Sequence, residues 1–228
     1  MNQGAQVLST AGGALAAQRN RVLRNTYWLL ALSMVPTVLG AWVGVQTGIA
    51  AAMSPGIGLV VFLAGAFGFM FAIEKNKNSA AGVPLLLAFT FFMGLMLSRL
   101  LGVVLGLNNG TGLIMTAFAG TGVIFFGMAA MSSVVKRDLS QMGKFLFIGM
   151  VMLLVAMIAN FFIQSSALMI TLSVLAIGIF SLFILHDLKR VQDGLETNYI
   201  SATLGVYLSI YNVFSNLLAL LGIFGGDD

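Results

Sequence analysis

Ionisable residues are rare within the apolar segments of this sequence, and three of them have side chains suited to chemistry. His186 and Asp187 are neighbours near the end of one apolar segment, and Arg99 lies in the second half of another. A charge at bilayer depth costs at least ~2.5 kcal/mol, so such residues are candidates for a functional site. The plainer alternatives are that Arg99 extends to the lipid headgroups and that Asp187 forms a solvated pair with Arg190. His186 points to another side of the helix, so we do not require it to pair with Asp187.

A polar stripe follows the last apolar segment. Its members are separated by four, four, three and four positions: Ser201, Gly205, Ser209, Asn212 and Asn216. Residues with this spacing share one face of a helix. Hydroxyl and amide groups inside a bilayer find their partners in protein or water, so the last helix is predicted to be enclosed by the others. The stripe either forms hydrogen bonds between helices or lines a permeation path.

Several chemistries are excluded by composition. The sequence has one histidine and no cysteine, which rules out ordinary His/Cys metal sites and thiol catalysis. It contains no Walker, Rossmann or H-E-x-x-H motif. A serine protease would depend on His186 at a segment end, and no lysine lies deep enough to carry a retinal Schiff base. We therefore expect a protein that is not an enzyme and has no cofactor or metal site.

Seven apolar segments position these residues. They are Thr26–Val45, Gly56–Ile73, Val83–Leu105, Leu113–Val135, Lys144–Ile163, Ala167–Leu188 and Ile200–Phe224. A bilayer core about 30 Å thick requires about 20 apolar residues per helix. Only 8% of the residues are charged, against about 25% in a soluble domain. The sequence predicts an all-α integral membrane protein with seven transmembrane helices.

The basic residues predict its orientation. Ten of the eleven Lys and Arg residues precede the first segment or occupy alternate connections: Arg19, Arg21, Arg24, Lys75, Lys77, Lys136, Arg137, Lys144, Lys189 and Arg190. Positive residues collect on the cytoplasmic side of a membrane. The N-terminus is therefore predicted to be cytoplasmic and the C-terminus to lie on the opposite side. The net charge of +4 arises from these loops and does not indicate nucleic-acid binding.

Two parts are expected along the chain. Residues 1–18, rich in Ala, Gly, Gln and Ser, are predicted to form a flexible cytoplasmic N-terminal tail, and residues 19–228 a seven-helix transmembrane domain. Short uncharged connections predict three helical hairpins, made by the first six helices in order, that enclose the seventh. Glycines spaced by four, at Gly40, Gly44 and Gly48, predict either close helix contact or a functional role as a hinge or pore lining.

Four stretches of the sequence resemble the Bax inhibitor (TMBIM) family in the same order. They are VLRNTYWLLALS from Val22, KRDLSQMGKFL over Lys136–Leu146, FILHDLKRV over Phe183–Val191 and NYISATLGVYLSIYNVFSNLLALLG over Asn198–Gly222. The first, together with ETNYI at Glu196–Ile200, is most similar to the bacterial YccA-like branch. The resemblance covers residues 20–224 and implies a seven-helix fold whose last helix is surrounded by the other six.

The resemblance implies two functions. Members of the YccA-like branch are substrates and modulators of the AAA membrane protease FtsH, which grips a cytoplasmic tail. The first hypothesis is therefore a bacterial inner-membrane protein in membrane-protein quality control and the stress response, with a periplasmic C-terminus. The alternative is a pH-sensitive calcium, cation or proton leak gated around Asp187, where segments Ala167–Leu188 and Ile200–Phe224 meet.

The leak hypothesis depends on a pair of aspartates in some family members, and this sequence departs from that pattern. Asp187 matches the first aspartate, Ser209 stands at the position of the second, and Asn212 matches a family asparagine. Ser209 can exchange a hydrogen bond with Asp187 but cannot supply the repulsion between like charges that raises a carboxyl pKa. Met93 stands near the position of another family acid, and Glu74 near a basic one.

Overall fold

The computed structural model describes residues 3–225, without the side chains of residues 3–12, 14 and 140. Within this part of the chain all regular structure is helical. The helices are α1 (Gln3–Thr47), α2 (Ile49–Ala52), α3 (Pro55–Asn76), α4 (Gly82–Leu105), α5 (Gly110–Val134), α6 (Ser140–Ile163), α7 (Ser166–Gln192) and α8 (Tyr199–Phe224). Seven of them are long and apolar enough to span a membrane, and α2 is a single turn between α1 and α3. The predicted all-α membrane fold with seven spanning helices is confirmed.

The first helix is longer than the sequence predicts. It begins at Gln3 and ends at Thr47. A helical backbone does not measure motion, so the division into a flexible tail of residues 1–18 and a domain of residues 19–228 stays a prediction. Residues 1, 2 and 226–228 lie outside the described part of the chain.

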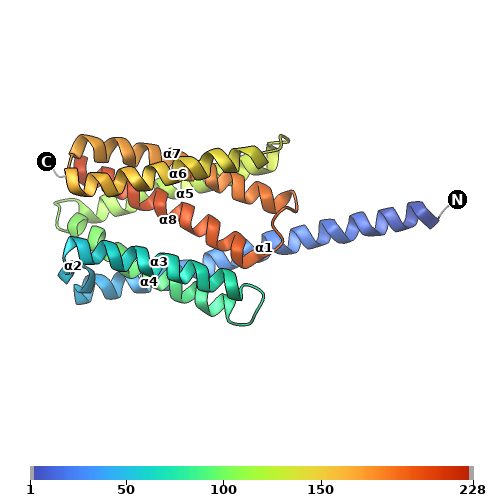
Figure 1. Ribbon diagram of the computed structural model, residues 1–228, viewed down its shortest axis with the longest axis horizontal. Coiled ribbons are helices and arrows are strands. Elements are labelled where there is room, and N and C mark those ends of the chain that lie inside the picture. Colours follow the sequence, from blue (N-terminus) through green and yellow to red (C-terminus); the bar gives the residue numbers. More distant parts are fainter. Residues whose placement is uncertain (1–2, 226–228) are drawn as a thin grey trace.

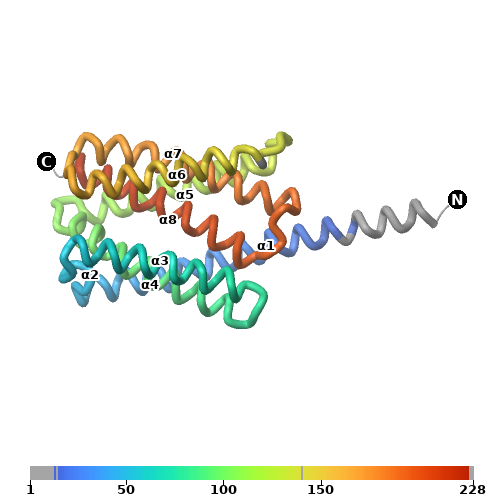
Figure 2. Tube along the Cα trace, in the orientation of Figure 1, coloured from blue at the N-terminus to red at the C-terminus, as the bar shows by residue number. Residues whose placement is uncertain are grey.

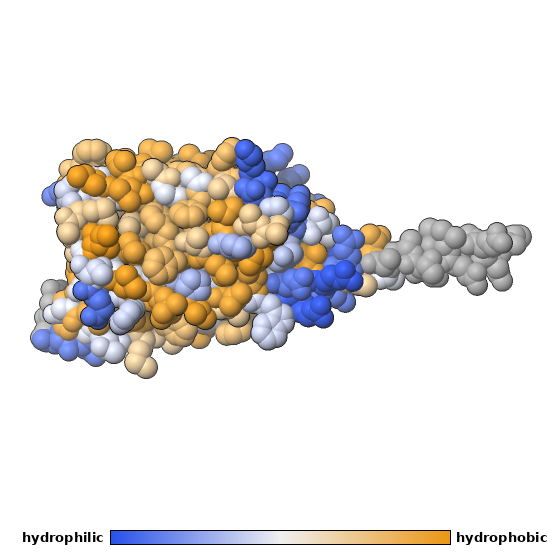
Figure 3. All heavy atoms as spheres, turned by 90° about the horizontal axis from the view of Figure 1, so that it is seen from below, coloured by the Kyte–Doolittle hydropathy of each residue, from blue (hydrophilic) through white to orange (hydrophobic). Residues whose placement is uncertain are grey.

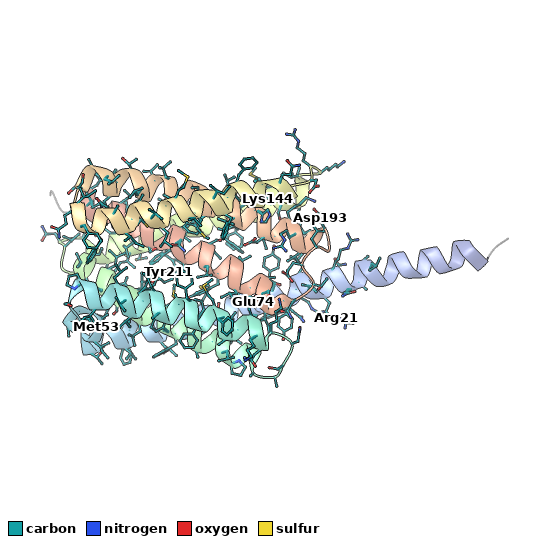
Figure 4. All side chains as sticks on the ribbon, viewed as in Figure 1. Arg21, Met53, Glu74, Lys144, Asp193 and Tyr211 are labelled. Atoms are coloured by element: carbon teal, nitrogen blue, oxygen red, sulfur yellow. The ribbon has the colours of Figure 1, made fainter. Side chains whose placement is uncertain are left out.

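Charged and apolar residues occupy different levels of the molecule. Arg21, Glu74, Lys144 and Asp193 lie near the end of the bundle where α1 enters, and Met53 lies near the opposite end (Figure 4). Between the two ends the visible face is largely apolar (Figure 3). The beginning of α1 and the end of α8 lie at opposite ends of the bundle (Figure 1). This banding suits a protein that crosses a bilayer; which end is cytoplasmic stays a prediction.

The closest helix packing joins α1 to α4. Gly40 of α1 lies against the Phe91 carbonyl, and Gly94 of α4 lies against the Thr37 carbonyl, so neither position has room for a Cβ atom. Gly44 likewise lies against the Ser98 side chain. Small residues let helix backbones approach closely in lipid, where packing is the main source of helix association. The predicted glycine contact is therefore present at the first two of the three positions.

The predicted set of three hairpins is not confirmed. In the described residues α1 packs chiefly on α4 and not on α3, its neighbour in sequence, because the glycines of α1 and α4 face each other. Helix α3 packs on α4, and α6 packs on α7. Loop length alone does not decide which helices adjoin.

Helix α8 is nevertheless the most enclosed of the seven. It runs between a layer containing α5, α6 and α7 and a layer containing α1, α3 and α4 (Figure 2). It packs against α1, α3, α4, α5 and α7, and no residue from Ile200 to Ile223 is exposed. By contrast α6 is peripheral and buries only Leu146 and Leu153 among its described side chains.

Two tyrosines hold α8 against its neighbours. The Tyr207 hydroxyl is 2.9 Å from Thr37 Oγ1 of α1, and its ring packs on Phe89 of α4 with the centroids 6.0 Å apart. The Tyr211 hydroxyl donates to the Met93 carbonyl of α4 at 3.3 Å. Buried tyrosine hydroxyls need such partners, so these bonds fix the position of α8 along α4.

At the end where α1 enters, Asn198 joins two loops. Its side-chain oxygen accepts from the Ile200 amide at 2.9 Å and caps α8, while its amide donates to the Lys77 carbonyl at 3.1 Å. Next to it the Lys77 ammonium donates to Glu74 at 2.7 Å, and this hydrogen bond raises the pKa of Lys77. The loops before α4 and α8 are thereby held together.

Candidate functional site

The last two turns of α7 present a pair of ionisable side chains. His186 Nδ1 lies 3.1 Å from Asp187 Oδ1. The histidine is buried, and the aspartate side chain is 18% exposed. The expectation that His186 points away from Asp187 is wrong, because the rotamers bring neighbouring side chains together at the helix surface. Arg190 does not pair with Asp187 either; its nearest acid is Glu196, at 3.9 Å.

Each member of this pair lies against a glycine of another helix. A Cβ atom at Gly143 of α6 would lie 2.6 Å from His186 Nε2. A Cβ atom at Gly205 of α8 would lie 2.8 Å from Asp187 Oδ2. Both distances are shorter than a carbon contact tolerates, so the two glycines make the space for the pair. The His186–Asp187 pair is therefore enclosed between α6 and α8.

Ser209 lies on α8 one turn after Gly205, but its hydroxyl is not hydrogen-bonded to Asp187. Its hydroxyl donates to the Gly205 carbonyl at 3.1 Å and is buried. Among the described side chains none of the hydrogen bonds joins Ser209 to Asp187. Gly205 thus contacts both predicted residues, the carboxylate of Asp187 from α7 and the hydroxyl of Ser209 from its own helix.

The stripe on α8 changes character one turn further on, where it faces a cavity of about 530 Å³. The cavity lies between α2 and α3 on one side, α4 and α8 behind, and α6 on the other side. It is lined by Ala50, Met53, Pro55, Gly58, Leu59, Phe62, Met96, Leu97, Arg99, Leu100, Met157, Phe161, Tyr211, Asn212, Ser215 and Asn216. The cavity extends from Met53, near the end of the bundle, to Tyr211, near the middle of α8 (Figure 4).

Three of the predicted residues meet at this cavity. Arg99 Nη1 donates to the Met53 carbonyl at 3.2 Å, so the side chain reaches the connection between α2 and α3. The amide groups of Asn212 and Asn216 donate to the carbonyls of Leu208 and Asn212, each at 2.8 Å. No hydrogen bond from the described residues reaches either side-chain oxygen of the two asparagines. Asn212 is therefore separated from the Asp187 level and belongs to the cavity around Arg99.

Ser201 is isolated from both groups. Its hydroxyl oxygen is buried near the Glu74 carboxylate without a hydrogen bond of ordinary geometry to any described residue. The polar stripe consequently crosses three environments: Ser201 near α3, Gly205 and Ser209 beside the His186–Asp187 pair, and the two asparagines at the cavity.

The described side chains include no group of three His, Cys, Asp or Glu residues that could hold a metal ion. Calcium takes six to eight oxygen ligands, usually with several carboxylates, and among the described residues the carboxylate that contacts Gly205 is that of Asp187. The residues that sequence reasoning missed are Gly143, which lies within the KRDLSQMGKFL stretch, and Met53. The stretch carries the family resemblance, but no pattern in the sequence connects its Gly143 to His186.

Known proteins match this chain over almost its whole length. The family model described as "Inhibitor of apoptosis-promoting Bax1" (Bax1-I) matches residues 19–226. An "Uncharacterized membrane protein" of Vibrio cholerae is 37% identical over 92% of this chain and 93% of its own length. A relative from Pseudomonas aeruginosa is 40% identical over 94% of this chain and 96% of its own length. The Escherichia coli K12 protein named "Modulator of FtsH protease YccA" is 37% identical over 91% of this chain and 92% of its own length.

Proposed function

The chain belongs to the Bax inhibitor family, and from that membership we propose that it is a substrate and modulator of an FtsH-type AAA membrane protease. The observation that carries the proposal is the similarity to the E. coli FtsH modulator over nearly the full length of both chains. The protein is an integral membrane protein with seven spanning helices. We place it in the bacterial inner membrane, with a cytoplasmic N-terminus, a periplasmic C-terminus and a role in membrane-protein quality control rather than in catalysis.

The start of α1 supports this proposal. It projects beyond the other helices at the end of the bundle where it enters (Figure 1). The side chains of Gln18 and Arg19 are exposed. A protease that pulls on a cytoplasmic terminus needs a segment it can engage before any membrane helix unpacks. Residues 1–18 would supply that segment.

Deletion of residues 2–18 tests the proposal. Because the bundle contacts of α1 to α4 lie further along the chain, at Gly40 and Gly44, the truncated chain is expected to fold. Its half-life in cells should rise severalfold in a chase experiment, and other FtsH substrates should accumulate. A chain that carries a permuted segment of equal length in place of residues 2–18 should be degraded at the original rate. Equal turnover of the truncated and full-length chains would contradict the proposal.

A second candidate function is a pH-sensitive leak of Ca²⁺, other cations or H⁺, gated around Asp187. The observation that favours it is the His186–Asp187 pair, which lies against the enclosed helix α8. The groups facing the pair from α6 and α8 are the uncharged Gly143 and Gly205, and the nearest charges in sequence are Lys189 and Arg190 on α7. A change of charge at Asp187 would act directly on its contact with Gly205 of α8.

Flux measurements in liposomes test the leak. The flux through wild type should differ between about pH 6 and about pH 8, and Asp187→Asn should remove the difference. Ser209→Asp places a second carboxyl near Gly205 and should steepen the pH dependence, because close carboxyl groups share a proton. Equal flux from wild type and both variants would contradict gating at Asp187.

A further inference from the structure

We propose that the cavity around Arg99 binds the headgroup of an anionic membrane phospholipid, with the phosphodiester at the Arg99 guanidinium and the first part of an acyl chain along the apolar wall. The site is separate from the tail and from the His186–Asp187 pair, so it does not depend on the function proposed above.

The first argument is the unbalanced charge of Arg99. The described carboxylates lie toward the end of the bundle where α1 enters, near the ends of α3 and α7 and in the neighbouring loops. They are those of Glu74, Asp138, Asp187, Asp193 and Glu196. Within the described residues the salt bridges do not include Arg99, whose one hydrogen bond is to the Met53 carbonyl. An unpaired charge within a membrane span is costly. An anion held at the guanidinium, with charge-assisted hydrogen bonds, would remove that cost.

The second argument is the neighbouring start of α3. Pro55 is the first residue of this helix, and Gly58 makes the first hydrogen bond back to Ser54, which leaves the amides of Gly56 and Ile57 without a partner inside the helix. A Cβ atom at Gly58 would lie 3.5 Å from Arg99 Nη1, so the guanidinium lies beside this first turn. Helix N-termini favour anions. The positive end of α3 therefore adds to the charge of Arg99.

The third argument is the amphipathic lining. Polar groups lie on α4 and α8, at Arg99, Asn212 and Asn216, while the remaining walls are made by apolar side chains: Leu59, Phe62, Met96, Leu100, Met157 and Phe161. A free inorganic anion would leave these walls unused, whereas a lipid would cover both kinds of surface. The positive charge of Arg99 favours an anionic lipid over a zwitterionic one, because the described residues supply no carboxylate beside it.

The fourth argument is access from the bilayer. Helices α3 and α6 both line the cavity but, in the described residues, do not pack closely against each other. Figure 1 shows α8 running between them. The volume of about 530 Å³ is typical of a ligand pocket and smaller than a whole phospholipid. The cavity would hold the headgroup and the beginning of one chain, and the rest of the lipid would remain in the bilayer.

Native mass spectrometry of the full-length protein with equal amounts of phosphatidylglycerol and phosphatidylethanolamine, matched in acyl chains, tests the proposal. Wild type should retain phosphatidylglycerol over phosphatidylethanolamine by about tenfold, the effect of one charge-assisted contact. Arg99→Gln should reduce this preference about tenfold, and Arg99→Lys should keep most of it. Arg137→Gln is the matched control, because it removes an equal charge from the loop between α5 and α6; its preference should equal that of wild type. Equal preferences in Arg99→Gln and Arg137→Gln would overturn the proposal.

Three further arms define the occupant. Met157→Trp fills the cavity without changing the charge and should also lower phosphatidylglycerol binding; unchanged binding would place the lipid elsewhere. Glycerol 3-phosphate should not displace the lipid, and displacement would identify a site for free anions instead. Asp227 and Asp228 lie outside the described residues, so a chain that ends at Gly225 should keep the preference of wild type. A preference present only in the shortened chain would mean that these aspartates pair with Arg99 in place of the lipid, which would overturn the proposal.

Discussion

Helix α8 has polar groups near it at two levels, and these groups differ in whether they have partners within the chain. Beside Gly205 the polar atoms are paired across close contacts: His186 with Asp187, and Ser209 with a backbone carbonyl. Beside Asn212 and Asn216 the polar atoms face a cavity. Polar groups away from water need partners. The first level obtains them within the chain, whereas the second leaves space for a molecule from outside.

The difference arises from the residues on the neighbouring helices. Gly143 and Gly205 let α6 and α8 close on the His186–Asp187 pair. At the other level Met157 and Phe161 of α6 line one side of the cavity and Leu59 of α3 the other, and the two helices stay apart. Small residues give a tight polar contact, and large apolar ones hold a cavity open. The tight level is expected to support stability, and the open level binding.

The largest expected effect comes from a side chain placed in the tight level. Gly205→Leu would force a branched side chain onto the Asp187 carboxylate, which a Cβ atom alone would already approach to 2.8 Å. Overpacking of this kind costs about 1–3 kcal/mol and sometimes more, so we expect the variant to lose about 3 kcal/mol of unfolding free energy. Thermal unfolding of the detergent-purified protein would measure it.

Gly178→Leu is the matched control for this change. Gly178 also belongs to a spanning helix, α7, but it is exposed and a Cβ atom there would meet nothing within 4 Å. Its substitution should leave the unfolding temperature within the scatter of wild type. Equal losses for the two variants would mean that the contact between Asp187 and Gly205 is no tighter than the surface of α7.

A smaller effect is expected when the contact between His186 and Asp187 is broken. Asp187→Ala would leave the buried His186 ring without its partner, and an unsatisfied buried polar group costs about 1–3 kcal/mol. Asp193→Ala is the comparison, because Asp193 pairs with Lys189 nearer the surface, where ion pairs contribute about 0–1 kcal/mol. The difference between the two variants in unfolding free energy should exceed about 1 kcal/mol. A larger loss for Asp193→Ala would contradict the assignment of Asp187 to the packed core.

The sequence allowed some of this comparison to be predicted. Hydrophobic runs of about 20 residues give the seven spans because bilayer thickness sets helix length. The stripe from Ser201 to Asn216 indicates that α8 is enclosed, because its spacing places polar groups on one face. Asp187 is identified because carboxylates in spans are rare. Each of these inferences depends on properties of a single helix.

Relations between helices could not be predicted in the same way. That α1 packs on α4 depends on Gly40 and Gly94 facing each other, and nothing in either helix alone specifies the partner. The pairing of His186 with Asp187 depends on rotamers that Gly143 and Gly205 permit. The cavity depends on how far α3 and α6 stay apart. Short loops predicted hairpins, but the close fit of small residues determines which helices adjoin.

The smallest effect is expected at the open level. Arg99→Met removes a charge that has no described carboxylate partner and fills part of the same volume with apolar atoms, so the lost hydrogen bond to Met53 is offset by the relieved cost of the charge. In lipid-free detergent the unfolding free energy should change by less than about 1 kcal/mol. Added phosphatidylglycerol should then stabilise wild type more than Arg99→Met, because a ligand stabilises the state to which it binds. If Arg99→Met destabilised the lipid-free protein as much as Asp187→Ala, Arg99 would belong to the packed structure, and the two levels of α8 would not differ in kind.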